Sequence, residues 1–131
     1  MQRERRSKSI LIVEDSPTTK ALIKAIVEEM GDFNTVEAGS GFEALKILPT
    51  QEFDLVITDI NMPDINGLEL ISFMKNNPRY NNLPVIIVST ERSEEDIKRG
   101  MSLGAMAYIT KPFKAHELQE VIKKAIVYEG I

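Results

Sequence analysis

Five side chains of this sequence could carry chemistry, and each stands at the end of a short apolar stretch. They are Glu14, Asp15, Asp59, Ser89 and Lys111. Carboxylates that lie close together repel one another, so they must take up protons or bind a cation. The chain has no cysteine and one histidine, which excludes a thiolate site and a site built from several histidines. Oxygen ligands alone favour Mg²⁺.

These residue types together predict phosphoryl chemistry at a carboxylate. A Mg²⁺ ion held by one or two carboxylates neutralises charge on a transferring phosphoryl group. Lys111 offers a second positive charge to the same group. Aspartate carboxylates are known nucleophiles for phosphoryl transfer and form aspartyl phosphates.

Such a site requires elements that bring distant residues to one edge. Alternating strands and helices predict an α/β fold whose parallel sheet is covered on both faces. Five such units fit the doubly wound, flavodoxin-like order 2-1-3-4-5 with five flanking helices, in which ligands bind at the carboxyl ends of the strands. The expected strands are Ile10–Val13, Asn34–Ala38, Leu55–Thr58, Val85–Val88 and Ala107–Ile109. The expected helices are Pro17–Met30, Ser40 to Pro49, Gly67–Asn76, Ser93 to about Leu103, and Ala115–Tyr128.

Helical spacing of apolar residues predicts which helix faces are buried. The first helix is expected to bury Leu22, Ile23, Ile26, Val27 and Met30, and the fourth carries the apolar residues Ile97 and Met101. The last is expected to bury Leu118, Val121, Ile122, Ala125 and Ile126. His116 is predicted to be a surface residue rather than a ligand.

Charge is distributed unevenly along the 131 residues. The net charge is −4, of which residues 1–8 contribute +3, leaving −7 on residues 9–131. We expect residues 1–8 to be a flexible basic leader and residues 9–131 to be one domain. An acidic body argues against nucleic acid as the main partner. No signal peptide and no apolar stretch of spanning length is present, so a cytoplasmic protein is expected.

Four motifs in this order resemble the receiver domain of bacterial two-component response regulators, including chemotaxis regulators. They are Ile12–Asp15, Asp59–Pro63 with Gly67, Ser89, and Lys111–Phe113. The resemblance implies that Asp59 accepts a phosphoryl group from a phosphohistidine of a sensor histidine kinase or a histidine phosphotransfer protein. Autodephosphorylation follows, so the chain catalyses its own modification and is not an enzyme with an external substrate.

The resemblance also implies how the site is held. Mg²⁺ is bound by Asp15, Asp59 and the backbone carbonyl of Asn61, and by Glu14 through water. Lys111 pairs first with Asp59 and then with the phosphoryl oxygens. Glu14 takes the place of the commoner aspartate, which is a conservative variant.

A switch is implied in the same way. Ser89 bonds a phosphoryl oxygen and moves toward it, and Tyr108 swings inward as it does. The face made by the fourth helix, fifth strand and fifth helix then changes its affinity for an output protein. The bond between Lys111 and Pro112 is often cis in this family.

Three residues near the acceptor are expected to set its rates. Asn61 and Glu91, two positions after Asp59 and Ser89, resemble those of receivers whose phosphorylation is short-lived, so we expect decay in seconds to minutes. Thr90 stands where many receivers have alanine or glycine, and its branched side chain is expected to narrow access to Asp59.

Three other functions compete with this one. Glu14 and Asp15 would repel the flavin phosphate of a flavodoxin-like electron carrier. An aspartate-nucleophile phosphatase typically has Asp-x-Asp, whereas Asp59 is followed by Ile60 and Asn61. A pseudo-receiver that acts only as a binding module does not need the complete set of acids, serine and lysine. A chemotaxis regulator and a phosphorelay carrier both fit, as a stand-alone receiver or an excised one.

Overall fold

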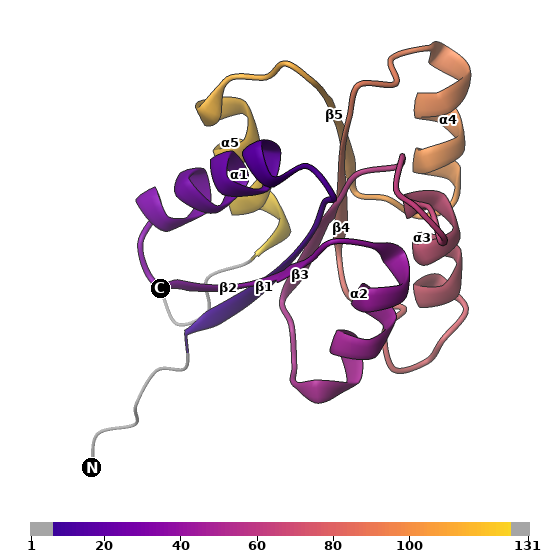
Figure 1. Ribbon diagram of the computed structural model, residues 1–131, viewed down its shortest axis with the longest axis horizontal. Helices are drawn as coiled ribbons and strands as arrows, with labels where there is room; N and C mark the ends of the chain where they lie inside the picture. Colours follow the sequence, from indigo (N-terminus) through magenta and orange to yellow (C-terminus); the bar gives the residue numbers. More distant parts are fainter. Residues whose placement is uncertain (1–6, 127–131) are drawn as a thin grey trace.

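One parallel sheet organises the chain in a computed structural model that describes residues 7–126 (Figure 1). Its order is β2-β1-β3-β4-β5, as predicted. The strands are β1 (Lys8–Val13), β2 (Phe33–Ala38), β3 (Leu55–Thr58), β4 (Val85–Ser89) and β5 (Ala107–Thr110). The helices are α1 (Pro17–Glu29), α2 (Gly41–Ile47), α3 (Gly67–Lys75), α4 (Glu94–Ser102) and α5 (Ala115–Ala125), with a 3-10 turn, η1, at Leu48–Thr50.

The two faces of the sheet carry separate cores. Successive residues of a strand point to opposite faces, so Ile10 and Ile12 pack toward α1 and α5. Leu11 and Val13 pack toward α2 and α3 on the other side. Figure 1 shows this division, with α1 and α5 on one side of the strands and α2, α3 and α4 on the other. Burial on both faces explains why β1, β3 and β4 contain continuous apolar runs, whereas the edge strand β2 is more polar and more exposed.

Short polar side chains start α1, α2, α3 and α4. Ser16, Ser40, Asn66 and Ser93 each accept a hydrogen bond from the backbone N–H three residues later. These bonds satisfy donors that a helix start leaves unpaired. The chain turns after α1 and α4 at Gly31 and Gly104, whose φ angles of 122° and 118° suit glycine.

The apolar pattern was wrong for Leu22 of α1 and did not indicate how α4 packs. Leu22 of α1 is 49% exposed, because the buried stripe is Ile23, Ile26 and Val27 and Leu22 lies outside it. Met101 of α4 is 42% exposed. This helix packs through Gly100 instead, where an added Cβ would lie 2.6 Å from Cδ1 of Ile87. The stripe of α5 is narrower than expected, with Leu118, Ile122 and Ile126 buried and Val121 and Ala125 half-buried.

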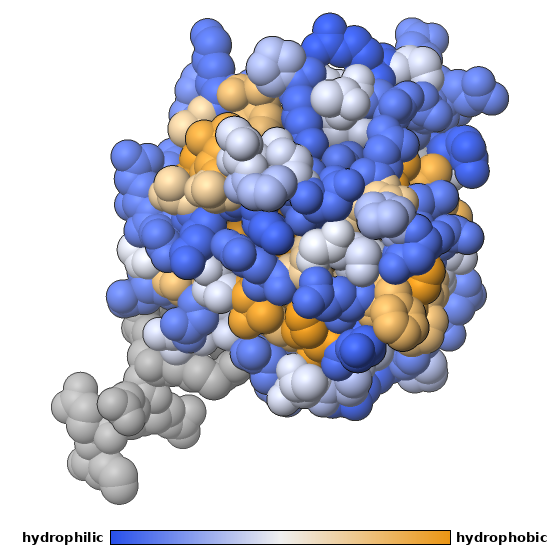
Figure 2. Space-filling view, in the orientation of Figure 1, coloured by the Kyte–Doolittle hydropathy of each residue, from blue (hydrophilic) through white to orange (hydrophobic). Residues whose placement is uncertain are grey.

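The element ends differ slightly from those predicted. β1 starts at Lys8 and pairs there with Phe33 of β2. α2 ends at Ile47, before Pro49, and the chain continues as η1. Residues 1–6 of the predicted leader, and Tyr128 at the predicted end of α5, lie outside the described residues. Within the described part, no helix combines the length and apolarity needed to cross a membrane. The face in Figure 2 is mainly hydrophilic, with smaller hydrophobic patches between hydrophilic residues.

Candidate functional site

The predicted site residues lie at the carboxyl edge of the sheet, because the backbone ladder continues just past the strand ends. Glu14 N–H donates to Ala38 O at 2.9 Å, Asp59 N–H to Val13 O at 3.0 Å, and Lys111 N–H to Ser89 O at 2.8 Å. These bonds join neighbouring strands. Acids and lysine are therefore fixed at the backbone by the sheet itself.

Lys111 bridges two buried carboxylates. Its Nζ lies 3.0 Å from Oε1 of Glu14 and 3.2 Å from Oδ2 of Asp59. Glu14 is 1% exposed and Asp59 is 7% exposed. Burial of two carboxylates is costly unless they are paired, and the lysine supplies the pairing charge.

The other carboxylate oxygen of Asp59 faces the backbone. Oδ1 accepts the N–H of Ile60 at 2.6 Å and that of Asn61 at 3.4 Å. Thr58 Oγ1 donates to the backbone carbonyl of Asp59 at 2.8 Å. Donors on both sides thus hold the Asp59 side chain in one orientation at the end of β3.

Gly67 lets α3 start directly against Asp59. A Cβ at this position would lie 2.0 Å from the carbonyl oxygen of Asp59, inside the contact distance of any two atoms. Gly67 N–H also donates to Ile60 O at 2.9 Å. The glycine is therefore required for the backbone to pass this close.

Burial and charge shift the ionisation of the bridged groups in different ways. Burial raises the pKa of Glu14, and this outweighs the lowering effect of the Lys111 hydrogen bond. Burial lowers the pKa of Lys111, but its hydrogen bond to Glu14 and the charges of Asp59 and Glu14 outweigh that effect, so the net pKa is raised. The lysine is held charged beside its carboxylates.

A pH dependence of stability follows from Glu14. Because its pKa is raised above the ordinary 4.5, the folded chain binds a proton where the unfolded chain has released it. Stability from this group therefore falls as the pH rises from 4.5 toward neutral, and Glu14→Gln should lack this fall. In urea unfolding across this pH range, the free energy of unfolding of Glu14→Gln should increase relative to that of the wild type as the pH rises. Glu95→Gln, on exposed α4, is the control, and parallel curves for Glu14→Gln and wild type would contradict the expectation.

A candidate cation site lies beside this bridge. Carboxylate oxygens of Glu14, Asp15 and Asp59 lie within 4.8 Å of one another, with Asp15 exposed to solvent. Three hard oxygen donors at one open edge fit a Mg²⁺ ion that keeps part of its water shell. Asn61, whose backbone carbonyl is the fourth predicted ligand, follows Asp59 by two residues.

The loop between β4 and α4 closes the other side of the site. Ser89 is fully buried, and its Oγ accepts the N–H of Glu91 at 3.1 Å. The side chain of Glu91 accepts Asn61 Nδ2 at 2.9 Å, and its backbone carbonyl accepts the Tyr108 hydroxyl at 2.7 Å. Thr90 is exposed at the rim. Glu91 thus connects the loop to β5 and to the loop after β3.

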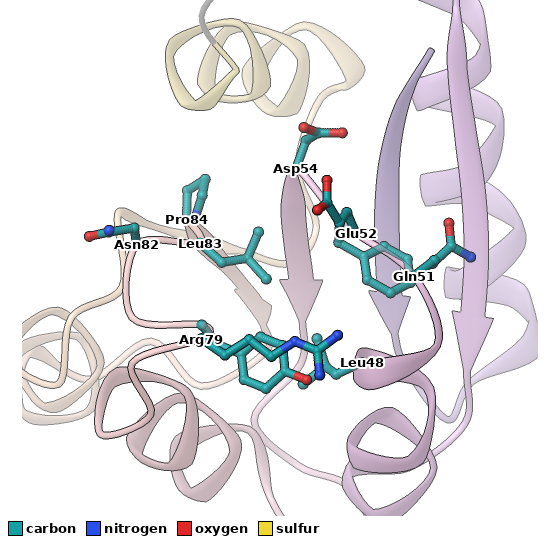
Figure 3. A pocket seen from close by; sticks show the side chains of 10 residues that line it. Leu48, Gln51, Glu52, Asp54, Arg79, Asn82, Leu83 and Pro84 are labelled. Carbon is teal, nitrogen blue, oxygen red and sulfur yellow. The ribbon is translucent and has the colours of Figure 1, made fainter. Parts of the chain in front are cut away.

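A separate cavity of about 420 Å³ opens at the opposite edge of the sheet (Figure 3). Asp54, immediately before β3, and Arg79 are among the residues that line it. Asp59 directly follows the same strand at the other edge. The cavity contains none of the predicted site residues and is a different place from the carboxylate cluster.

Comparison with known proteins identifies the family. The family model named response regulator receiver domain matches residues 10–123, a range that contains all the predicted site residues. The chain belongs to the response regulator receiver family. The receiver is similar to the chemotaxis protein CheY of Pseudomonas aeruginosa, with 37% identity over 88% of this chain and 93% of that protein.

Solved structures agree with this assignment. The receiver resembles the signal receiver domain of a signal transduction histidine kinase from Syntrophus aciditrophicus, with a TM-score of 0.85 and 35% identity over 95% of this chain and 97% of that one. It also resembles the Mn²⁺-bound form of response regulator Rcp1, with a TM-score of 0.75 and 26% identity over 90% and 88% of the two chains. The fold and the two-component signalling class are thereby shown.

Several features of the receiver's site were expected and others were missed. The peptide bond between Lys111 and Pro112 is cis, and His116 is exposed, both as predicted. A role of Lys111 as counter-ion to the acids was considered from the sequence, and its bonds to Glu14 and Asp59 agree with it, although the resemblance gave Glu14 only a role toward the metal. A hydrogen bond from Arg92 Nη2 to the backbone carbonyl of Lys111, 2.8 Å long, was also missed. No periodicity or motif marks that loop residue.

Proposed function

We propose that this receiver accepts a phosphoryl group on Asp59 from a phosphohistidine of a sensor histidine kinase or a histidine phosphotransfer protein. The observation that carries the proposal is a buried aspartate held between backbone N–H groups and a lysine shared with Glu14. Burying a carboxylate costs free energy. An aspartate that only forms a turn can stay exposed, so the burial of Asp59 favours a functional role.

The transfer itself needs few groups. A carboxylate oxygen of Asp59 forms a bond to phosphorus while the bond from phosphorus to the imidazole nitrogen breaks, and the electron pair stays on the ring. Lys111 Nζ, 3.2 Å from Oδ2, is within reach of the incoming phosphoryl oxygens and offsets their charge. Hydrolysis of the aspartyl phosphate later returns the carboxylate, which makes the receiver a catalyst of its own modification only.

Mg²⁺ is the proposed cofactor. Asp15, Asp59 and the backbone carbonyl of Asn61 would hold it, and Glu14 would act through water. When bound, the ion neutralises phosphoryl oxygens. The cluster of three carboxylates within 4.8 Å supports this assignment, as does the Mn²⁺ ion in the similar response regulator Rcp1.

Signalling is proposed to pass from Ser89 and Tyr108 to an output protein on the face of α4, β5 and α5. Ser89 Oγ accepts from Glu91 N–H, and its own hydroxyl hydrogen can donate to a phosphoryl oxygen, so a movement of Ser89 toward that oxygen would be passed to the Glu91 loop. Tyr108 is tied to the same loop through Glu91 O. Met101 and Met106 are 42% and 37% exposed near this face and offer apolar contact area. Phosphorylation would then bias two pre-existing states of the face.

Intact-mass measurement tests the proposal. Incubation of the wild type with Mg²⁺ and acetyl phosphate is expected to add the mass of one phosphoryl group, and Asp59→Asn is expected to add none. Asp64→Asn, an exposed position of the same loop, is the matched control and should behave as wild type. A phosphoryl gain that persists in Asp59→Asn would remove Asp59 from its proposed role.

Thr90→Ala is expected to be phosphorylated faster than wild type by acetyl phosphate. The threonine is exposed at the rim, directly after buried Ser89, and its branched side chain restricts the approach of a donor to Asp59. We expect about a threefold to tenfold higher rate, as a positional effect on donor approach. Equal rates in the two proteins would contradict the steric role of Thr90.

The phosphoryl group is expected to be short-lived. Asn61 and Glu91 place polar atoms at the mouth of the site, joined by a hydrogen bond of 2.9 Å, where they can orient an attacking water. After removal of the donor, the added mass should decay in seconds to minutes in the presence of Mg²⁺. Survival of the phosphorylated form for many hours in buffer would be evidence against this role.

A further inference from the structure

Both backbone polar groups of Lys111 are bonded by the segment 89–92. Its N–H donates to the carbonyl of Ser89 at 2.8 Å, and its carbonyl accepts Nη2 of Arg92 at 2.8 Å. Segment 89–92 runs from the end of β4 toward α4, and Lys111 opens the turn after β5. Figure 1 shows that these two connections leave the sheet at the same edge.

Arg92 is the side chain of this segment that reaches Lys111. The other bonds of the loop hold Glu91 instead, from Asn61 and from Tyr108. The bond from Arg92 carries a full positive charge on its donor, so it is stronger than a bond between neutral groups. Arg92 is exposed, but it donates one of the two hydrogen bonds that hold the backbone of Lys111; the other joins Lys111 N–H to the carbonyl of Ser89.

We infer that Arg92 is a positioning residue for Lys111 in the acceptance of the phosphoryl group, an inference that rests on the function proposed for Asp59. The ammonium of Lys111 must sit 3.0 and 3.2 Å from two different carboxylates, at the end of a flexible side chain. A backbone fixed at both N–H and carbonyl limits where that side chain starts. Small displacements of a catalytic charge lower rates, so the attachment matters although Arg92 touches no reacting atom.

The test measures phosphorylation rate against acetyl phosphate concentration in Mg²⁺. Arg92→Ala is expected to lower the saturating rate about fivefold and to change the half-saturating concentration by less than about twofold. Arg92→Lys, which keeps a charged donor, should recover at least half of the lost rate. Arg99→Ala removes the same charge from exposed α4 and should leave both quantities at wild-type values. Urea midpoints confirm that all four proteins are folded in the assay.

The outcomes separate the two levels of inference. Wild type that gains no phosphoryl group overturns the proposed function, and the role of Arg92 with it. Wild type that gains it, with Arg92→Ala equally fast or faster, overturns only the positioning role. A change confined to the half-saturating concentration and shared by Arg99→Ala would show that Arg92 merely attracts the anionic donor, which also overturns the inference.

Discussion

Gly67→Ala is expected to lower the free energy of unfolding by about 2–4 kcal/mol. The added Cβ, whose position is fixed by the backbone of Gly67, would lie 2.0 Å from the backbone carbonyl oxygen of Asp59, so no flexible side chain can relieve the overlap. Helix propensity alone predicts the opposite sign, because alanine is favoured over glycine in a helix by about 1 kcal/mol. Steric overlap outweighs helix propensity here, and urea denaturation of the two proteins decides between them.

Gly39→Ala provides the control for this substitution. A Cβ there would meet only side-chain atoms, at 3.5 and 4.0 Å, which is ordinary contact. Its unfolding free energy should stay within about 1 kcal/mol of wild type. If Gly67→Ala is as stable as the wild type, α3 can shift away from Asp59 at little cost. The rate at which acetyl phosphate phosphorylates the variant would then show whether such a shift disturbs Asp59.

Lys111→Met is expected to lower the free energy of unfolding at pH 7 by about 2–4 kcal/mol, because it leaves Glu14 and Asp59 buried without their shared cation. Loss of the Lys111 hydrogen bond should raise the pKa of Glu14 further, so the folded variant takes up a proton that the unfolded chain has released. The stability lost at neutral pH should therefore return as the pH falls. Urea midpoints at pH 5 and pH 7 measure this recovery.

Two comparisons make the lysine experiment specific. Lys124→Met, on the exposed side of α5, should change stability by no more than about 0.5 kcal/mol at either pH. Addition of Mg²⁺ should stabilise Lys111→Met more than wild type, because a cation at the carboxylates replaces the missing charge. If Lys111→Met is as stable as the wild type at pH 7 and Mg²⁺ does not change its stability, then Glu14 and Asp59 do not need the lysine charge in the folded state.

The sheet could be predicted because the apolar runs that mark its strands and the rules for connecting parallel strands indicate the same fold. Four-residue apolar runs such as Ile10–Val13 report burial on both faces, and the order of strands follows from the chirality of the crossovers. The convergence of Glu14, Asp59 and Lys111 follows from the same geometry, since parallel strands end at one edge. The resemblance to receivers then supplied roles that residue types alone left open.

Side-chain contacts were harder to predict, for physical reasons that differ from case to case. Periodicity gives the centre of a buried stripe but not its margins, so Leu22 was misplaced. The packing of α4 was not predicted, because this helix packs through Gly100 and a hydrophobicity pattern does not mark a glycine. The bonds of Glu91 and Arg92 depend on the conformation of a loop, where no repeating geometry links residue number to direction.

The partners of the Lys111 bridge are far apart along the chain. Lys111 and Glu14 are 97 residues apart in sequence, and β5, which carries the lysine to the edge, is the last strand. Contacts between such distant residues form only after large loops have closed, so the bridge cannot exist in a chain that has made β1 to β4 alone. A growing or partly folded chain holds Asp59 without its cation. Under the proposed function, the acceptor site is therefore complete only after β5 has joined the sheet.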